Sequence, residues 1–385
     1  MKQNKRIFDL VAYIAIIILA LLFLYVGNKV ASKGIAIEYQ EGEFATAEAK
    51  VTKILDIYED EADWFSSTTV IFEARITKGA DKDEIITAFQ TLGSYSSLDK
   101  EVSEGDKILV NSYDGSWSFS GYVRVNKIVI LGGIFIVLLL LFGRIKGLNA
   151  ILTLGFTCIA VFAVFIPAIL SGKNIYMSSI VVCIYTIIVT LFLLNGINKK
   201  SLAAVAGCFG GVIAAGLLTF FMSSALGLTG LINDETMYLV NLPTENPIDL
   251  KAIVFAGIII GAVGAIMDVA VSISSALWEL KEQAQNLTFN ELFKSGLNIG
   301  KDIMGSMANT LVLAYIGSSL SMILLLVVYA VSFIDLFNLE LVIVELLQAI
   351  IGATGILLTM PLTALICAAL YSKKTKPVKE PLNEE

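Results

Sequence analysis

Eight long apolar stretches follow one another along the chain, separated by short polar connections and one long polar segment. A helix needs about 20 apolar residues to cross roughly 30 Å of hydrocarbon. Most of the stretches reach that length. The sequence therefore predicts an α-helical polytopic membrane protein with about eight spans. The stretches are Phe8–Gly27, Lys127–Phe142, Leu148–Leu170, Ile175–Leu194, Leu202–Met222, Ala252–Trp278, Ile303–Phe333 and Leu341–Tyr371.

The basic residues of the connections predict the orientation of these spans. Lys and Arg gather in cytoplasmic loops, and with the N-terminus inside every predicted inner segment is basic. The short outer connections hold only Lys173 and Lys251. We therefore expect both termini in the cytoplasm, with residues 372–385 as a cytoplasmic tail. The first apolar run is longer than that of a cleaved signal sequence, so residues 1–27 are interpreted as a retained transmembrane anchor.

Residues 28–126 have a different, alternating pattern that is typical of strands. Strands are expected at Ala45–Ile57, Thr68–Thr77, Lys107–Ser112 and Ser116–Val125. Asp114-Gly115 indicates a type I′ hairpin between the last two, and a short helix is expected from Asp83 to Thr91. The segment has 18 acidic and 10 basic residues, a net charge of −8. We expect a small extracytoplasmic β-barrel, OB-like or similar, ahead of a seven-helix domain at residues 127–371.

The composition limits the chemical functions that the chain can have. The chain is 56% hydrophobic and 16% charged, whereas soluble domains are about 25% charged. It contains no histidine, which excludes Ser-His-Asp catalysis and His-ligated zinc or haem. A net charge of −7 argues against a nucleic-acid partner. We expect no enzyme activity, no cofactor and no metal, and the four cysteines lie in predicted spans rather than in a disulfide framework.

The sixth stretch carries the most informative polar pattern. Residues spaced three and four apart share one helix face, and here that face changes from glycine to hydroxyl and carboxylate. The glycines are expected to allow close helix packing, and the polar half is expected to line a pathway. The face consists of Gly257, Gly261, Gly264, Asp268, Ser272, Ser275 and Glu279.

Asp268 is the central residue of this hypothesis. A carboxylate inside a bilayer costs at least about 2.5 kcal/mol, and no basic residue lies well inside any span. Asp268 must therefore be protonated, hydrated in a cavity or neutralised by a bound cation. The structural alternative is a protonated Asp268 that is hydrogen-bonded to a neighbouring helix.

The seventh stretch begins with a second polar face, made of Asp302, Ser306 and Asn309 with Thr310 beside them and Tyr315 further along. This face is expected to meet that of Asp268. Asn309 could equally have only a structural role, as a hydrogen-bonding residue between two helices. Before it, Thr288 and Glu291 form a predicted capping box, which opens a short amphipathic helix at the inner membrane surface.

The eighth stretch contains a proline. Pro361 removes one backbone hydrogen bond and is expected to kink the helix, and such breaks can free carbonyls beside a transport site. Glu345 and Gln348 lie near the outer end of the same stretch.

At these motifs the chain resembles the YibE/F family of bacterial multispanning membrane proteins. The resemblance covers about Leu131 to Tyr371, and the outer segment resembles the small β domain of longer family members. It implies a bacterial plasma membrane but names no substrate. It rests on Met267-Asp268-Val269-Ala270 with Ser272 and Ser275, on Gly300–Gly305 with Asn309–Leu311 and Leu313–Tyr315, and on Pro361-Leu362-Thr363.

Two functions are compatible with these patterns. The first is a permease for an ion or small solute, in which Asp268 binds a proton or monovalent cation. The second is a non-transporting scaffold or sensor, whose outer domain binds an envelope component or a partner protein. Besides the lipid bilayer, the sequence identifies no partner, and it does not predict an oligomeric state.

Overall fold

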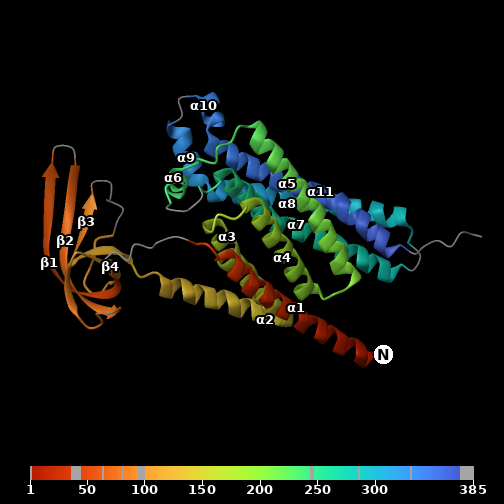
Figure 1. Ribbon diagram of the computed structural model, residues 1–385, viewed down its shortest axis with the longest axis horizontal. Coiled ribbons are helices and arrows are strands. Elements are labelled where there is room, and N and C mark those ends of the chain that lie inside the picture. Colours follow the sequence, from red (N-terminus) through yellow and green to blue (C-terminus); the bar gives the residue numbers. More distant parts are fainter. Residues whose placement is uncertain are drawn as a thin grey trace, which may run out of the picture. The chain divides into compact units, whose positions relative to one another are not determined.

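The computed structural model describes residues 2–35, 45–62, 65–79, 81–93, 100–242, 247–284, 287–329 and 332–372. The chain divides into two compact units (Figure 1). One unit consists of Met1–Ile37 and Phe142–Glu385, and the other of Glu38–Leu141. The predicted tail beyond Ser372 lies outside the described residues.

The smaller unit contains a closed five-stranded barrel in the order β1-β2-β3-β5-β4. Strand β4 lies beside β1 while β1, β2 and β3 follow one another, which is a Greek-key arrangement. The pair β3–β5 is parallel and the other four pairs are antiparallel. The strands are β1 (Ala45–Ala62), β2 (Phe65–Lys78), β3 (Ile85–Gly93), β4 (Lys107–Tyr113) and β5 (Ser116–Tyr122).

Alternation along the strands explains the barrel core. On β2, the buried residues Val70, Phe72, Ala74 and Ile76 are two positions apart, so their side chains point to the same face. Residues Ala45–Lys50 of β1 pair with β4, and Val51 exchanges two backbone hydrogen bonds with Gly105 and Asp106, whereas the rest of β1 pairs with β2 alone among the strands of the described chain. The predicted small barrel is thus confirmed.

The helix predicted from Asp83 to Thr91 is wrong, because this segment forms strand β3. Its residues alternate in burial, with Ile86, Ala88 and Gln90 inside, and they pair along β2. Pairing with a neighbouring strand and burial of one face decide the structure here. The Asp114-Gly115 hairpin is confirmed, since both residues have the positive φ (49° and 76°) of a type I′ turn.

A charged contact joins Lys100 and Asp106, just before β4. Lys100 Nζ donates to both carboxylate oxygens of Asp106, at 3.1 and 2.8 Å, and lies over the ring of Tyr122. The hydrogen bond from Lys100 lowers the pKa of Asp106 below its ordinary value. Because Lys100 is exposed, the contact adds little to stability.

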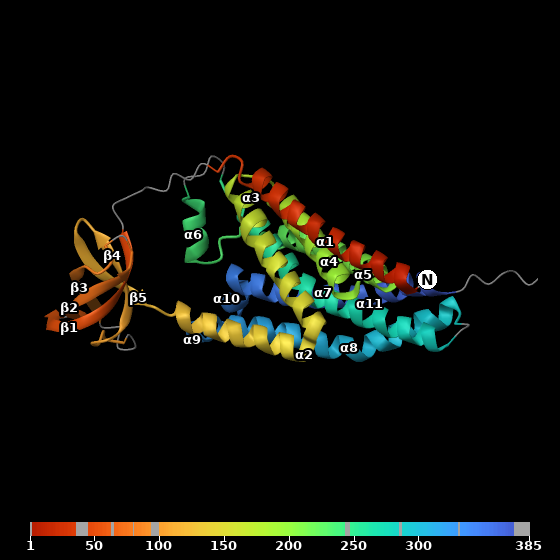
Figure 2. The same ribbon diagram turned by 90° about the horizontal axis from the view of Figure 1, so that it is seen from below.

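The larger unit is a bundle of helices in which α4, α5, α7 and α11 lie side by side (Figure 1 and Figure 2). Helix α8 lies along α11, and α1 along α4. The helices of the chain are α1 (Lys2–Ala31), α2 (Val125–Ala160), the π-helix η1 (Val161–Phe165), α3 (Ile166–Leu170), α4 (Ile175–Asn195), α5 (Lys199–Ala225), α6 (Asp234–Val240), α7 (Leu250–Gln283), α8 (Phe289–Ser318), α9 (Leu320–Tyr329), α10 (Phe333–Asn338) and α11 (Glu340–Tyr371). Helix α2 belongs to the larger unit from Phe142 onward.

Polar side chains mark where the long helices begin. Asn174, Asn198 and Asp249 each accept a hydrogen bond from the backbone N–H three residues further on, which satisfies a donor that the helix leaves free. The predicted capping box is confirmed. The Thr288 N–H donates to Glu291 Oε2 (2.8 Å) and the Glu291 N–H donates to Thr288 Oγ1 (3.3 Å).

Six helical segments of the described chain are long and apolar enough to cross a membrane, or up to seven if the bent pair α8 and α9 is one span. The predicted number of eight is therefore not confirmed. Two predicted stretches fall in one 46-residue segment, Val125–Leu170. The backbone of that segment leaves the helical region at Arg144, with φ 49° and ψ −124°.

The predicted seventh span differs from the structure at both ends. The amphipathic helix that was expected before it is not separate, because α8 runs without interruption from Phe289 to Ser318. The helix axis then bends by 66° into α9. Gly317, Ser318 and Ser319 occupy the break, and Gly and Ser pairs are common at sharp helix bends.

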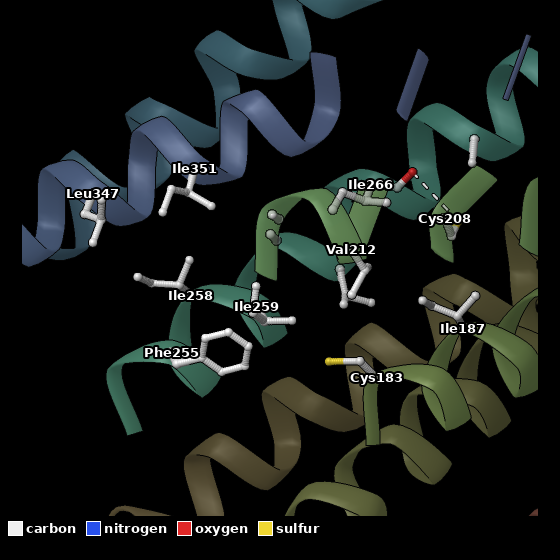
Figure 3. Close-up of a cluster of buried hydrophobic side chains, with 14 of the residues drawn as sticks. Cys183, Ile187, Cys208, Val212, Phe255, Ile258, Ile259, Ile266, Leu347 and Ile351 are labelled. Atoms are coloured by element: carbon white, nitrogen blue, oxygen red, sulfur yellow. Dashed lines mark hydrogen bonds between the residues drawn. The ribbon is translucent and has the colours of Figure 1, made fainter. Parts of the chain in front are cut away.

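The bundle core is apolar and is assembled from four helices (Figure 3). Cys183 and Ile187 come from α4, Cys208 and Val212 from α5, Phe255, Ile258, Ile259 and Ile266 from α7, and Leu347 and Ile351 from α11. Such close packing, rather than hydrophobic exclusion of water, holds helices together in lipid.

Candidate functional site

Asp268 lies near the middle of α7, on the face of the helix that points away from the core. Buried α7 residues such as Ile266, Ile273 and Leu277 form one side of the helix. The predicted stripe occupies the opposite side. Gly257, Gly261, Gly264, Asp268 and Glu279 are exposed there, and Ser272 and Ser275 are half-buried.

The carboxylate of Asp268 makes no hydrogen bond or ion pair with the residues that the structure describes. Nor do the hydroxyls of Ser272 and Ser275 supply one, and Glu279 lies about three turns further along the helix. The hydrogen bond to a neighbouring helix that we considered as the structural alternative is therefore not formed among the described residues. Two ion pairs occur in the described chain, Lys78–Glu48 and Lys100–Asp106, and both belong to the barrel.

The glycines of the stripe have two different environments. A Cβ atom placed on Gly257 or Gly264 would meet no atom within 4 Å, so these two glycines border open space. A Cβ atom on Gly261 would lie 3.0 Å from Tyr315 Oη and 3.5 Å from Gln348 Nε2. Only Gly261 therefore serves the close helix approach that we expected of all three.

Tyr315 is the one residue of the second predicted stripe that the structure brings against the first. Its hydroxyl oxygen is buried and has no hydrogen-bond partner in the described chain. Further along, Gly296 of α8 lies against Leu277 of α7. These two contacts define an antiparallel register, which puts Asp268 at the level of Ser306.

The other residues of the second stripe point away from α7. The packed side of α8 contains Leu292, Gly296 and Gly300, and the stripe lies on its opposite side. Ser306 Oγ donates to the Ile303 carbonyl (3.0 Å) and Thr310 Oγ1 to the Ser306 carbonyl (2.8 Å). The structure leaves Asp302, Ser306, Asn309 and Thr310 exposed.

Pro361 lies within α11, which continues through it as one helix of 32 residues. The expected break is therefore not a gap in the helix. On either side of the proline, Thr359 and Thr363 are fully buried. Thr359 Oγ1 donates to the Gly355 carbonyl (2.6 Å), and Thr363 Oγ1 has no partner in the described chain.

These threonines pack against two glycines of α5, a contact that the sequence analysis did not predict. A Cβ atom on Gly207 of α5 would lie 2.1 Å from Thr363 Oγ1, and one on Gly211 would lie 1.9 Å from Thr359 Oγ1. The spacing Gly207–Gly211 is a GxxxG pattern, so the sequence carried a signal for this contact.

Beside the stripe lies a cavity of about 320 Å³ between α2, η1, α4 and α7. Thr153 and Thr157 of α2 line it together with Thr186 and Thr190 of α4. The sequence analysis did not identify these residues. Two threonine pairs at i, i+4 spacing on otherwise apolar helices were the available signal.

Within the described ranges, no group of three or more His, Cys, Asp or Glu side chains is placed to hold a metal ion. The site thus offers one carboxylate, several hydroxyls and no basic group. Such a site can bind a cation or exchange a proton.

Long apolar helices and a closed barrel define this chain as a membrane-embedded helical protein with a small β domain. The profile of the YibE/F-like protein family matches residues 131–373. That is more than half of the chain, which therefore belongs to this family, in agreement with the resemblance of its motifs. Comparison with curated proteins found no match, and neither did comparison with solved structures.

Proposed function

We propose that this protein is a plasma-membrane permease for an ion or a small solute, and that Asp268 is the residue that binds a proton or cation. The observation that carries the proposal is the position of Asp268. It lies near the middle of α7, without a partner among the described residues, and one helical turn after Gly264, which lines a mostly apolar cavity that contains four threonines. An intramembrane acid of this kind is a functional-site hypothesis by default.

The cost of placing a carboxylate in lipid supports this role. That cost is at least about 2.5 kcal/mol, and a salt bridge would ordinarily offset it. Because no basic side chain is available, a proton, a bound cation or water in the neighbouring cavity has to offset this cost at Asp268, and the proposal takes the proton or cation. Reversible binding of that charge is what a transport cycle uses.

The proposed topology has eight spans, with both termini in the cytoplasm and residues 28–126 outside. At 1.5 Å per residue, the 46 residues of Val125–Leu170 measure about 70 Å along a helix. This exceeds twice the thickness of the hydrocarbon core. We therefore assign two spans to the segment, joined at the backbone break of Arg144.

The outer barrel is proposed to be OB-like and to capture or admit the solute. A five-stranded Greek-key barrel is the architecture of OB folds. The acidic surplus of residues 28–126 would concentrate cations near the entrance.

Ion flux through purified protein in liposomes tests the proposal. Vesicles containing a pH-sensitive dye are given a proton gradient, with Na⁺ or K⁺ varied outside. We expect the wild type to conduct. The flux through Asp268→Asn should be at least about tenfold lower, because the neutral amide cannot bind a proton or neutralise a cation. The matched control is Asp234→Asn, an exposed carboxylate in the first turn of α6, which should retain full flux.

The two functions make opposite predictions in this assay. If no gradient drives flux of protons, Na⁺ or K⁺ through the wild type, a permease for these ions is excluded, and either a permease for another solute or a scaffold or sensor becomes the better account. Flux that is equal in wild type and Asp268→Asn would exclude the role of Asp268 while leaving transport in place.

A further inference from the structure

The cavity beside Asp268 has the size of a small organic molecule. Its volume of about 320 Å³ lies at the lower end of the range for ligand pockets. A space of about 10–15 Å³ on this measure already holds one water molecule, so a single dehydrated ion would leave most of the cavity empty. The volume favours a solute with several carbon atoms.

The walls of the cavity are apolar except for threonine hydroxyls. Thr153 and Thr157 lie one helical turn apart on α2, and so do Thr186 and Thr190 on α4. Thr153 Oγ1 donates to the carbonyl of Ala150 (2.9 Å), which leaves its lone pairs free to accept. No charged side chain of the described chain lines the cavity.

One end of the cavity reaches the face of α7 that bears Asp268. Gly264 and Met267 belong to the lining, and Asp268 follows Gly264 by one helical turn on the same face. Because no atom lies within 4 Å of a Cβ position at Gly264, the space beside this glycine is open. Asp268 is thus the nearest charge on α7 to the cavity.

The backbone next to the cavity is also unusual. Val161, the first residue of the π-helix η1, is part of the lining. Short π-helical turns within α-helices are rare and occur frequently at functional sites. A wider turn at this point changes which side chains face the cavity, and Pro167, which cannot donate a backbone hydrogen bond, lies two residues after its end.

We propose that this cavity binds a hydrophobic organic monocation, such as a small aryl- or alkylammonium ion, with Asp268 as its counter-ion. The apolar walls contact the hydrocarbon part of the solute, the threonine hydroxyls contact its polar edge, and the carboxylate at the open end neutralises its charge. This inference rests on the proposed function and names the substrate class of the same site.

Binding of benzyltrimethylammonium to the full-length protein in detergent tests the inference without requiring transport. Neopentylbenzene is the comparison ligand, since it has the same shape with a neutral carbon in place of the charged nitrogen. We expect calorimetry to detect the cation in wild type. Asp268→Asn should weaken its binding by about 30-fold or more, the loss expected when one member of a desolvated charge pair is removed.

A matched pair of glycine variants locates the site. Gly264→Val and Gly257→Val both place a side chain on the exposed face of α7, where no atom lies within 4 Å of either Cβ position. Gly264 lines the cavity and Gly257 does not. We expect Gly264→Val to weaken binding of the cation by about tenfold and Gly257→Val to leave it unchanged.

The outcomes separate this inference from the proposed function. Proton or Na⁺ flux without binding of benzyltrimethylammonium overturns the inference and leaves the permease standing. Binding of benzyltrimethylammonium without its uptake into liposomes that contain the protein supports the site and overturns transport. Equal binding of the neutral compound, or equal effects of the two glycine variants, overturns the proposed charge pairing or the proposed location respectively.

Discussion

Helices α5 and α7 both carry stripes of glycine, and the two stripes have opposite environments. On α5, Gly207 and Gly211 lie directly against Thr363 and Thr359 of α11. On α7, Gly257 and Gly264 border open space. The same residue type thus creates a tight contact in one helix and leaves room in the other.

The difference shows that spacing alone does not assign the role of a glycine stripe. Periodicity places residues on one face of a helix, but the neighbour of that face depends on the fold. In α5 the neighbour is another helix, whereas in α7 Gly264 borders a cavity and Asp268 follows it by one helical turn. Glycine next to an acid in a membrane helix is therefore compatible with a pathway as well as with packing.

The largest expected change in stability comes from adding a methyl group where α5 touches α11. In Gly207→Ala the new Cβ would lie 2.9 Å from Thr363 Cβ and 3.2 Å from its Cα, so α11 has to move. We expect a loss of about 3 kcal/mol in the free energy of unfolding, measured in detergent. Gly216→Ala is the control on the same helix, because its Cβ would be 3.6 Å from Phe255, an ordinary contact. Equal losses in both variants would contradict the comparison.

A smaller effect is expected at Gly261, where α7 does have a neighbour. Gly261→Ala places a Cβ 3.0 Å from Tyr315 Oη and should cost about 1 kcal/mol. In a Tyr315→Phe background that cost should vanish, because the ring carbon Cζ lies 4.0 Å away. A double-mutant cycle of unfolding free energies measures this coupling. Additive effects would show that the two residues are not in contact.

The smallest effect, with the opposite sign, is expected at the open glycines. Gly257→Ala and Gly264→Ala should each raise the free energy of unfolding by about 0.5–1 kcal/mol, because glycine weakens a helix interior relative to alanine. The same unfolding experiment measures it. A clear loss of stability in either variant would mean that the stripe packs against something, and that the contrast with α5 is false.

Sequence patterns predicted most elements of this molecule and fewer of its contacts. The apolar stretches, four of the five strands and the Thr288 capping box depend on local chemistry, and these were found. Strand β3 was missed because its pairing with β2 is a property of the assembled barrel. The bend after Ser318 was missed as well, although Gly317 and Ser318 mark it.

For the site, the sequence identified the face of α7 but not the surroundings of that face. Helical periodicity grouped Asp268 with its glycines correctly. The same argument grouped Asp302 and Asn309 on α8, yet that face points away from α7. The threonine-lined cavity involves α2 and α4, which lie far from Asp268 in sequence, so only the three-dimensional arrangement could reveal it.

The unequal pairing of β1 has a consequence for how copies of this protein coexist. Beyond Ile54, β1 pairs with β2 alone in the described chain, and a strand of another copy could add to such a free edge. Asp56 and Glu59 lie along this edge, so two approaching edges repel each other. Molecules embedded in the same membrane meet often, and this repulsion opposes association of two barrels through strand addition. Screening by high salt weakens that protection.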